Sequence, residues 1–266
     1  MISIPLLKRN IMICVKAFLG VFAILCLYTI TIIYMYNPKL SEMLSGYQEV
    51  LPDMMAAVGM TGMASNILEW MQIYLYGFIM MLFPLIFIII LVKKLLMEYI
   101  DNGSMANLLA TPNSRGKIIT TQVLSLVIWI VLLMVSVTAM GVISCEIMFP
   151  GELEIATYLK LNASTFLLML ALTGIAFLAA CCFQEARHYY TVGAGLPILF
   201  FIIQMMSNMG AKLENFKYAT IYTLLPAGKI VAGEGEIWKY NLALVGIILI
   251  LYSIGIWQFC RRDLSL

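Results

Sequence analysis

The chain has 266 residues, of which 63% are hydrophobic and 11% are charged, and its formal net charge is +2. Soluble domains carry about 25% charged residues, so this composition excludes a soluble domain and indicates an integral membrane protein. The small net charge argues against binding to nucleic acid. The length leaves no room for a nucleotide-hydrolysing domain beside a membrane domain of several spans.

The N-terminal quarter of the chain predicts one membrane span followed by an acidic outer loop. Residues 1–10 are typical of a short interfacial start, and residues 11–36 are apolar and long enough to cross a membrane. Residues 39–69 carry four acids and include 54–60, which predicts an interfacial helix too short to span. This loop is either a solvated cap over the outer face or a release surface for cationic amphipathic cargo.

The second span is expected over residues 70–92 and contains Pro84. Proline removes a backbone donor from the helix and kinks its axis, which membrane helices tolerate. The kink serves either helix packing or a gating hinge.

A polar segment, residues 93–117, lies between two strongly apolar runs and reads KKLLMEYIDNGSMANLLATPNSRGK. Residues 105–110 predict a short helix with Ser104 as its N-cap. Pro112 ends that helix, because the residue before a proline disfavours helical geometry.

The C-terminal half predicts four more spans, over 118–145, 162–183, 191–209 and 240–259. Residues 210–239 form a large loop whose apolar part is broken by proline and glycine, which predicts short interfacial or re-entrant helices on the outer face. The sequence therefore predicts an all-α integral membrane protein, a single transmembrane domain of six spans.

The distribution of basic residues sets the expected orientation. Six spans place both termini on one side of the membrane, and the positive-inside rule assigns the more basic side to the cytoplasm. We therefore expect a multi-pass protein of the bacterial plasma membrane with both termini in the cytoplasm. The basic residues on that side are Lys8, Arg9, Lys16, Lys93, Lys94, Arg115, Lys117, Arg187, Arg261 and Arg262.

Motifs for catalysis or metal binding are absent from the sequence. The single histidine, His188, falls in a predicted cytoplasmic loop, and the six cysteines show no spacing typical of a metal site. The span cores carry no acid, histidine or lysine, so an intramembrane enzyme and a proton-coupled transporter are disfavoured. A sodium-coupled transporter is disfavoured on the same ground, although broken helices can bind sodium through backbone carbonyls alone.

Weakly polar side chains within the spans are the candidates for a cargo pathway. For each of them, including Gln122 and Ser125, hydrogen bonding between helices is the simpler interpretation. Gln204 is the best pathway candidate, because a full amide in hydrocarbon needs partners. The other candidates are Ser136, Thr138 and Thr173.

The polar segment resembles the membrane subunit of ABC type-2 exporters. The matching residues are Glu98, then GSMANLLATP over 103–112, Ser114-Arg115 and Lys117-Ile118-Ile119. The run LPAGKIVAG over 225–233 is similar to the family's outer loop before the last span, and Arg261-Arg262-Asp263-Leu264 is similar to its tail.

The resemblance implies that the polar segment is a coupling helix docking on a separate ABC ATPase subunit. The implied contact residues are Glu98, Gly103, Leu108, Leu109, Pro112 and Arg115, with Arg187 and His188 as a second, smaller contact. It also implies that residues 1–10 begin an interfacial connecting helix. ATP and Mg²⁺ would bind the partner ATPase, so this chain would carry no cofactor. A second copy of the chain or a related permease would complete the membrane part.

The function expected on these grounds is ATP-driven export of an amphipathic or hydrophobic cargo, such as a peptide or toxin, a lipid or a drug. The alternative is a non-transporting membrane scaffold or immunity protein that binds a membrane-active peptide. An intramembrane enzyme is the third and weakest interpretation.

Overall fold

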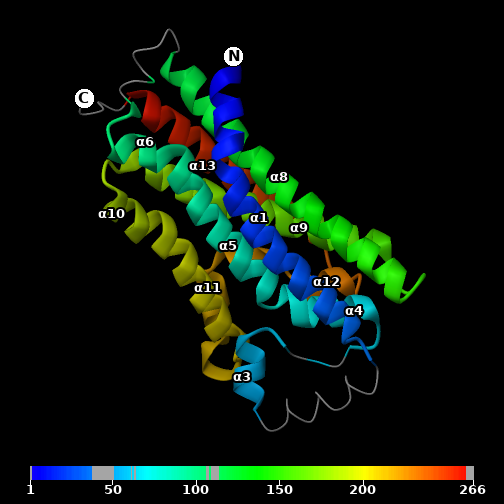
Figure 1. Cartoon of the computed structure of the whole chain (residues 1–266). Helices are drawn as coiled ribbons and strands as arrows, with labels where there is room; N and C mark the ends of the chain where they lie inside the picture. The colour runs from blue at the N-terminus through cyan, green and yellow to red at the C-terminus, as the bar shows by residue number, and fades with distance from the viewer. Residues whose placement is uncertain are drawn as a thin grey trace.

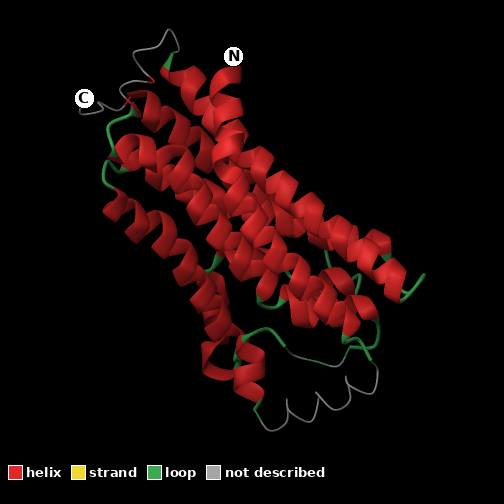
Figure 2. Ribbon diagram, viewed as in Figure 1, coloured by secondary structure: helices red, strands yellow, loops and turns green. Residues whose placement is uncertain are grey.

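The computed structural model describes residues 2–37, 51–60, 62, 64–105, 108 and 114–261, and every regular element among them is a helix (Figure 2). Six helical segments are long and apolar enough to span a membrane, as the sequence predicts. They are α1 (Ile4–Tyr34), Ile79–Asp101, α8 (Arg115–Met148), α9 (Ile155–Cys182), Ala186–Asn208 and α13 (Ile237–Arg261).

Most of the helices start before the predicted spans, because residues at the membrane boundary continue the helical backbone. Helix α8 begins at Arg115, where the hydroxyl of Ser114 accepts a hydrogen bond from the Lys117 backbone N–H, 3.3 Å away. Helix α1 begins at Ile4 and runs without a break to Tyr34, so residues 4–10 are its first turns rather than a separate interfacial helix.

The second span departs from the predicted pattern. It is built from α4 (Ile67–Met71), a π-helical turn η1 (Gln72–Tyr76), α5 (Ile79–Val92), a second π-helical turn η2 (Lys93–Met97) and α6 (Glu98–Asp101). The helix is interrupted at Gly77 and Phe78, whereas α5 continues through Pro84. At this interruption Gly59, from the outer loop over residues 39–69, packs closely against the backbone of the second span. A Cβ atom on Gly59 would lie 2.8 Å from the Gly77 Cα.

The bundle is centred on α9, which packs against α13, α5 and α8, while α1 packs against α8 and α5 (Figure 1). Helices α9 and α13 approach closely through glycines. A Cβ atom on Gly255 would lie 2.5 Å from the ring of Phe177, and one on Gly174 would lie 3.2 Å from Tyr252. Small residues at such crossings let membrane helices pack backbone to backbone.

The fifth span lies at one side of the bundle (Figure 1). It consists of α10 (Ala186–Tyr189), the π-helical turn η3 (Tyr190–Ala194) and α11 (Gly195–Asn208). Its far end contacts α3 (Pro52–Ala57) and the 3₁₀ helix η4 (Ala211–Ala219).

Short helices follow α11, as the sequence predicts for this loop: η4, the 3₁₀ helix η5 (Ile221–Leu224) and α12 (Ala227–Val231). The Thr220 hydroxyl donates a hydrogen bond to the Phe200 carbonyl, 3.0 Å away, which folds this segment back against α11. At the same end, the rings of Tyr36 and Trp70 meet edge to face. Burial, and secondarily the carboxylates of Glu152 and Glu69, raise the pKa of the Tyr36 hydroxyl.

Candidate functional site

One end of the bundle collects the functional residues expected from the sequence. Helix α1 begins there, α6 ends there, α8 and α10 begin there, and α13 ends there (Figure 1). We call it the basic end, because it carries the basic residues around residues 8–9, 93–94, 115–117 and 187.

After α6, the chain makes a tight turn within the polar segment. Gly103 has a φ of +71°, a conformation that L side chains rarely adopt. The Asn102 side-chain oxygen accepts hydrogen bonds from the backbone N–H and the hydroxyl of Ser104, at 3.0 and 2.6 Å. The Ser104 carbonyl in turn accepts from the Leu108 N–H at 3.4 Å. Ser104 therefore stands at the start of a helical turn, but its hydroxyl bonds back to Asn102.

The coupling residues expected in this segment differ in environment. Glu98 is exposed on α6, and Leu108 packs against the hydrophobic core. Met105 is almost fully buried, so it anchors the segment to the bundle. Leu109 and Pro112 lie outside the described residues.

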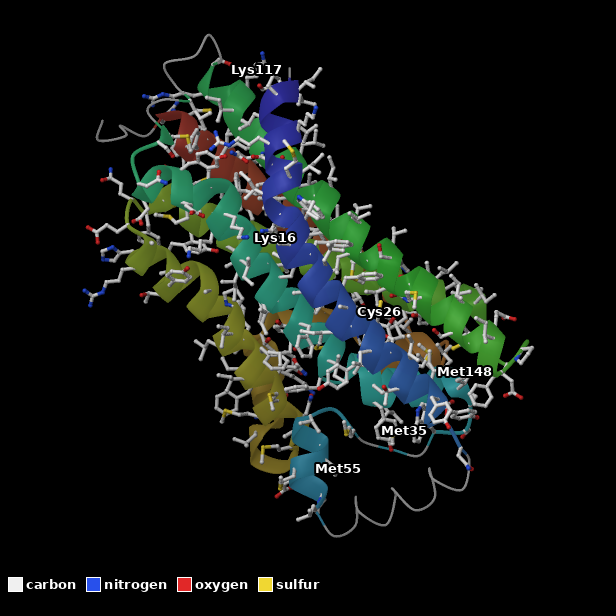
Figure 3. All side chains as sticks on the ribbon, in the orientation of Figure 1. Lys16, Cys26, Met35, Met55, Lys117 and Met148 are labelled. Atoms are coloured by element: carbon white, nitrogen blue, oxygen red, sulfur yellow. The ribbon has the colours of Figure 1, made fainter. Side chains whose placement is uncertain are left out.

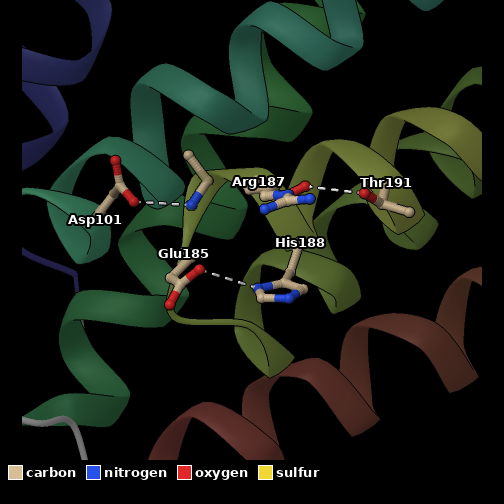
Figure 4. Close-up of polar contacts among 6 residues, drawn as sticks. Asp101, Glu185, Arg187, His188 and Thr191 are labelled. Atoms are coloured by element: carbon tan, nitrogen blue, oxygen red, sulfur yellow. Dashed lines mark hydrogen bonds and ion pairs between the residues drawn. The ribbon is translucent and has the colours of Figure 1, made fainter.

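The second expected contact, around Arg187 and His188, lies beside the first. The Asp101 carboxylate at the end of α6 accepts a hydrogen bond from the backbone N–H of Ala186, 2.8 Å away. Figure 4 shows this bond together with the contact between Glu185 and the His188 Nδ1, which are 3.4 Å apart. Arg187 and His188 are both exposed. The end of α6 and the start of α10 thus lie side by side at the surface.

Buried aromatic contacts hold α10 in this position. Tyr189 is fully buried, and its hydroxyl donates a hydrogen bond to the Ile89 carbonyl on α5, 3.0 Å away. Gly193 leaves room for the Tyr189 ring, since a Cβ there would lie 2.7 Å from it. The Lys93 ammonium lies 5.8 Å from the centre of the Tyr190 ring. The second and fifth spans are therefore joined directly by a hydrogen bond and a cation–ring contact.

The comparison with known families bears on this arrangement. Residues 11–264 match the family model described as ABC-2 family transporter protein. The chain belongs to this family. No curated protein and no solved structure matches it. The protein is accordingly a membrane subunit of an ABC transporter and is not itself the catalytic part. An ABC ATPase partner is implied for the family in general.

The four pathway candidates of this ABC-2 permease all form hydrogen bonds within their own helices. The hydroxyls of Ser136, Thr138 and Thr173 each donate to the carbonyl four residues earlier in the same helix, at 2.6 to 2.7 Å. Gln204 donates through its side-chain nitrogen to the Asn208 side chain, 2.9 Å away. Each side chain therefore has a partner inside the protein.

Thr138 alone among these four lines an apolar groove of about 620 Å³ between α8 and α9 of the permease. Asn162 also lines it, but its side-chain oxygen accepts from the Tyr76 hydroxyl at 2.8 Å, so its amide is held within the bundle. The other walls are hydrocarbon: Val131, Met134, Val135, Val142, Ile143 and Phe166 are among them.

A buried polar cluster at the start of α1 was not singled out from the sequence. The Asn10 side-chain nitrogen donates to Gln122 Oε1 and to Ser125 Oγ of α8, both at 2.8 Å. Gln122 and Ser125 therefore accept hydrogen bonds from another helix, which agrees with the simpler interpretation of the polar side chains within the spans. The spacing of residues in the sequence could have revealed that Asn10 is buried, because Asn10 continues the four-residue period of the buried Leu6, Cys14 and Phe18.

Proposed function

We propose that this permease is the membrane-spanning part of an ATP-driven exporter for an amphipathic or hydrophobic cargo. A separate ATPase subunit would bind ATP and Mg²⁺, and a second copy of the chain or a related permease would complete the membrane part. Membership of the ABC-2 family supports the permease role.

The observation that carries the proposal is the joined surface at the basic end. Asp101 bonds to Ala186, so Glu98 on α6 and the exposed Arg187 and His188 on α10 belong to one docking face. By the positive-inside rule this end lies in the cytoplasm, where a soluble ATPase is available. Closure of the ATPase pair would push this face and tilt the second and fifth spans together.

The apolar groove between α8 and α9 supports the cargo class. Ligand sites are commonly apolar clefts of about 300–1,000 Å³, and this groove has about 620 Å³. Its hydrocarbon walls suit an apolar or amphipathic molecule and offer no fixed charge to an ion.

The test is a mild-detergent purification of the tagged full-length chain from its native membrane, with mass spectrometry of the proteins retained. We expect an ABC ATPase in near-equal amount. Glu98→Ala, Arg115→Ala and Arg187→Ala should each reduce the ATPase recovered while leaving the amount of permease in the membrane unchanged. Recovery of the chain without an ATPase, under conditions that preserve other ABC complexes, would refute the proposal. Binding of a membrane-active peptide without any nucleotide dependence would then favour the immunity-protein alternative.

A further inference from the structure

A small notch of about 280 Å³ opens at the basic end between α1 and the η2–α6 segment. Arg9 and Ile13 line it from α1. Lys94, Glu98 and Tyr99 line it from the other side, together with the turn at Asn102 and Ser104. It shares Glu98 with the docking face proposed for the ATPase, whereas no residue of α10 lines it.

The charges around the notch are predominantly positive. Arg9 and Lys94 contribute two cations, against the one carboxylate of Glu98. Among the described residues neither cation makes an ion pair; the Arg9 guanidinium instead lies over the Tyr99 ring, 5.4 Å from its centre. A guanidinium has five N–H donors in one plane, so most of its donors stay available to an anion in the notch.

Tyr99 forms part of the wall of the notch on the side of α6. The residue is only 6% exposed, and its hydroxyl has no hydrogen-bond partner in the structure. Buried tyrosine hydroxyls usually find a partner. The ring lines the notch beneath the Arg9 guanidinium, and a phosphate bound in the notch would contact Arg9 and Lys94 rather than this enclosed hydroxyl.

The surroundings point to a lipid as the source of that phosphate. Past the notch, α1 exposes Ile11, Met12 and Val15, which are apolar side chains fit to lie against acyl chains. Lys16, exposed two turns further along α1, can extend its ammonium back toward the head-group level. Its position on the helix is shown in Figure 3. A free phosphate ion would leave Ile13 and this apolar flank without a role.

We propose that the notch between α1 and α6 binds the phosphate of an anionic phospholipid at the surface of the membrane. The acyl chains lie along the exposed face of α1. This site holds the start of α1 against the turn at Asn102 and Ser104. The binding itself does not depend on an ATPase partner or on the identity of the cargo.

The experiment titrates the purified full-length permease with short-chain phosphatidylglycerol and, separately, with phosphatidylcholine, and measures bound lipid by native mass spectrometry. A basic residue near an anionic membrane surface contributes about 1 kcal/mol, or roughly fivefold in affinity. We therefore expect Arg9→Gln and Lys94→Gln each to weaken phosphatidylglycerol binding by about fivefold. Arg9→Lys, which keeps the charge, should retain most of the binding and exclude misfolding as the cause.

Two further variants sharpen the test. Lys8→Gln is the matched control, because Lys8 is exposed and neighbours Arg9 but does not line the notch; its effect should be small. Glu98→Gln should tighten phosphatidylglycerol binding, because it removes the only negative charge among the lining residues. Weaker binding in Glu98→Gln would show that the notch holds a cation, and would overturn the proposal.

The remaining outcomes also decide the matter. Equal affinity for the two lipids in all variants would overturn the proposal. Displacement of phosphatidylglycerol by millimolar inorganic phosphate would show a free-phosphate site instead. If Arg9→Gln abolished ATPase recovery while lipid binding stayed intact, the notch would belong to the ATPase interface. Loss of lipid binding with ATPase recovery preserved supports the lipid site irrespective of how the proposed export function fares.

Discussion

The carboxylate of Asp101 accepts a hydrogen bond from the backbone N–H of Ala186 across 2.8 Å, although 85 positions separate the two residues. Asp101 closes the second span and Ala186 opens the fifth. The bond satisfies one of the backbone donors that the first turn of every helix leaves without an intrahelical partner. It places a negative charge where the helix dipole favours one. It also joins the two polar segments assigned to the ATPase contact.

Asp101→Ala is expected to loosen α10 without unfolding the bundle. A hydrogen bond of this kind contributes about 1 kcal/mol, which corresponds to roughly fivefold faster amide exchange at Ala186 if local opening governs it. Hydrogen–deuterium exchange of the detergent-solubilised protein measures this change. Asp101→Asn keeps a side-chain oxygen acceptor and should exchange more slowly than Asp101→Ala. Equal protection in all three proteins would contradict the assignment.

Gly141→Ala is expected to destabilise the packing of α8 on α9. A Cβ atom at this position would collide with the Tyr158 hydroxyl, and Tyr158 is fully buried with no space to retreat. Overpacking of a core costs about 1–3 kcal/mol, which should lower the thermal midpoint in detergent. Gly246→Ala on α13 is the matched control, because nothing lies within 4 Å of the added Cβ. Combining Gly141→Ala with Tyr158→Phe should recover part of the loss.

Asn10→Leu is expected to weaken the contact between α1 and α8. It removes the donor shared by Gln122 and Ser125 and leaves the Gln122 side-chain oxygen without that bond in a buried position. Hydrogen bonds between membrane helices contribute about 0.6–2 kcal/mol, so the thermal midpoint should fall modestly. A double-mutant cycle with Gln122→Leu isolates the pair, and additive effects of the two changes would show that the bond contributes nothing.

Ala163→Trp is expected to impair transport by filling the groove between α8 and α9. Ala163 is exposed and lines that groove, so a large side chain can enter it without disturbing the core. Uptake of fluorescent amphipathic peptides into inverted vesicles containing the complex should fall, while ATPase recovery should stay unchanged. Gly246→Ala serves again as a substitution remote from the groove. Unchanged uptake for every peptide tested would remove the groove from the cargo pathway.

The six spans could be predicted from sequence because their apolar runs are long and bounded by charged residues, as at Lys93 and Lys117. Their ends could not, since α9 begins at Ile155, ahead of the span predicted from residue 162, and continues through Lys160. The interruption of the second span was also beyond prediction. Pro84 gives a visible signal, whereas Gly77 acts through its approach to Gly59, a contact between distant segments.

The candidate site was predictable to a similar degree. The resemblance of residues 98–119 to a known family singled out the segment that we propose as the coupling segment, and the bond between Asp101 and Ala186 brings the start of α10 beside the end of α6. The role of Asn10 required knowledge of its neighbours, because an asparagine beside charged residues is typical of a membrane boundary. Only the packing of α1 on α8 makes it a buried donor.

The reciprocal glycines of α9 and α13 limit how the protein can move. Gly255 accommodates the Phe177 ring from α9, and Gly174 accommodates Tyr252 from α13, with the two rings stacked 5.3 Å apart. If either helix slid along its axis, an aromatic ring would move off its glycine and collide with the side chain of a neighbouring residue. These two spans must therefore travel as one body. In the alternating-access cycle that we propose, the change would come from the other spans moving around this pair.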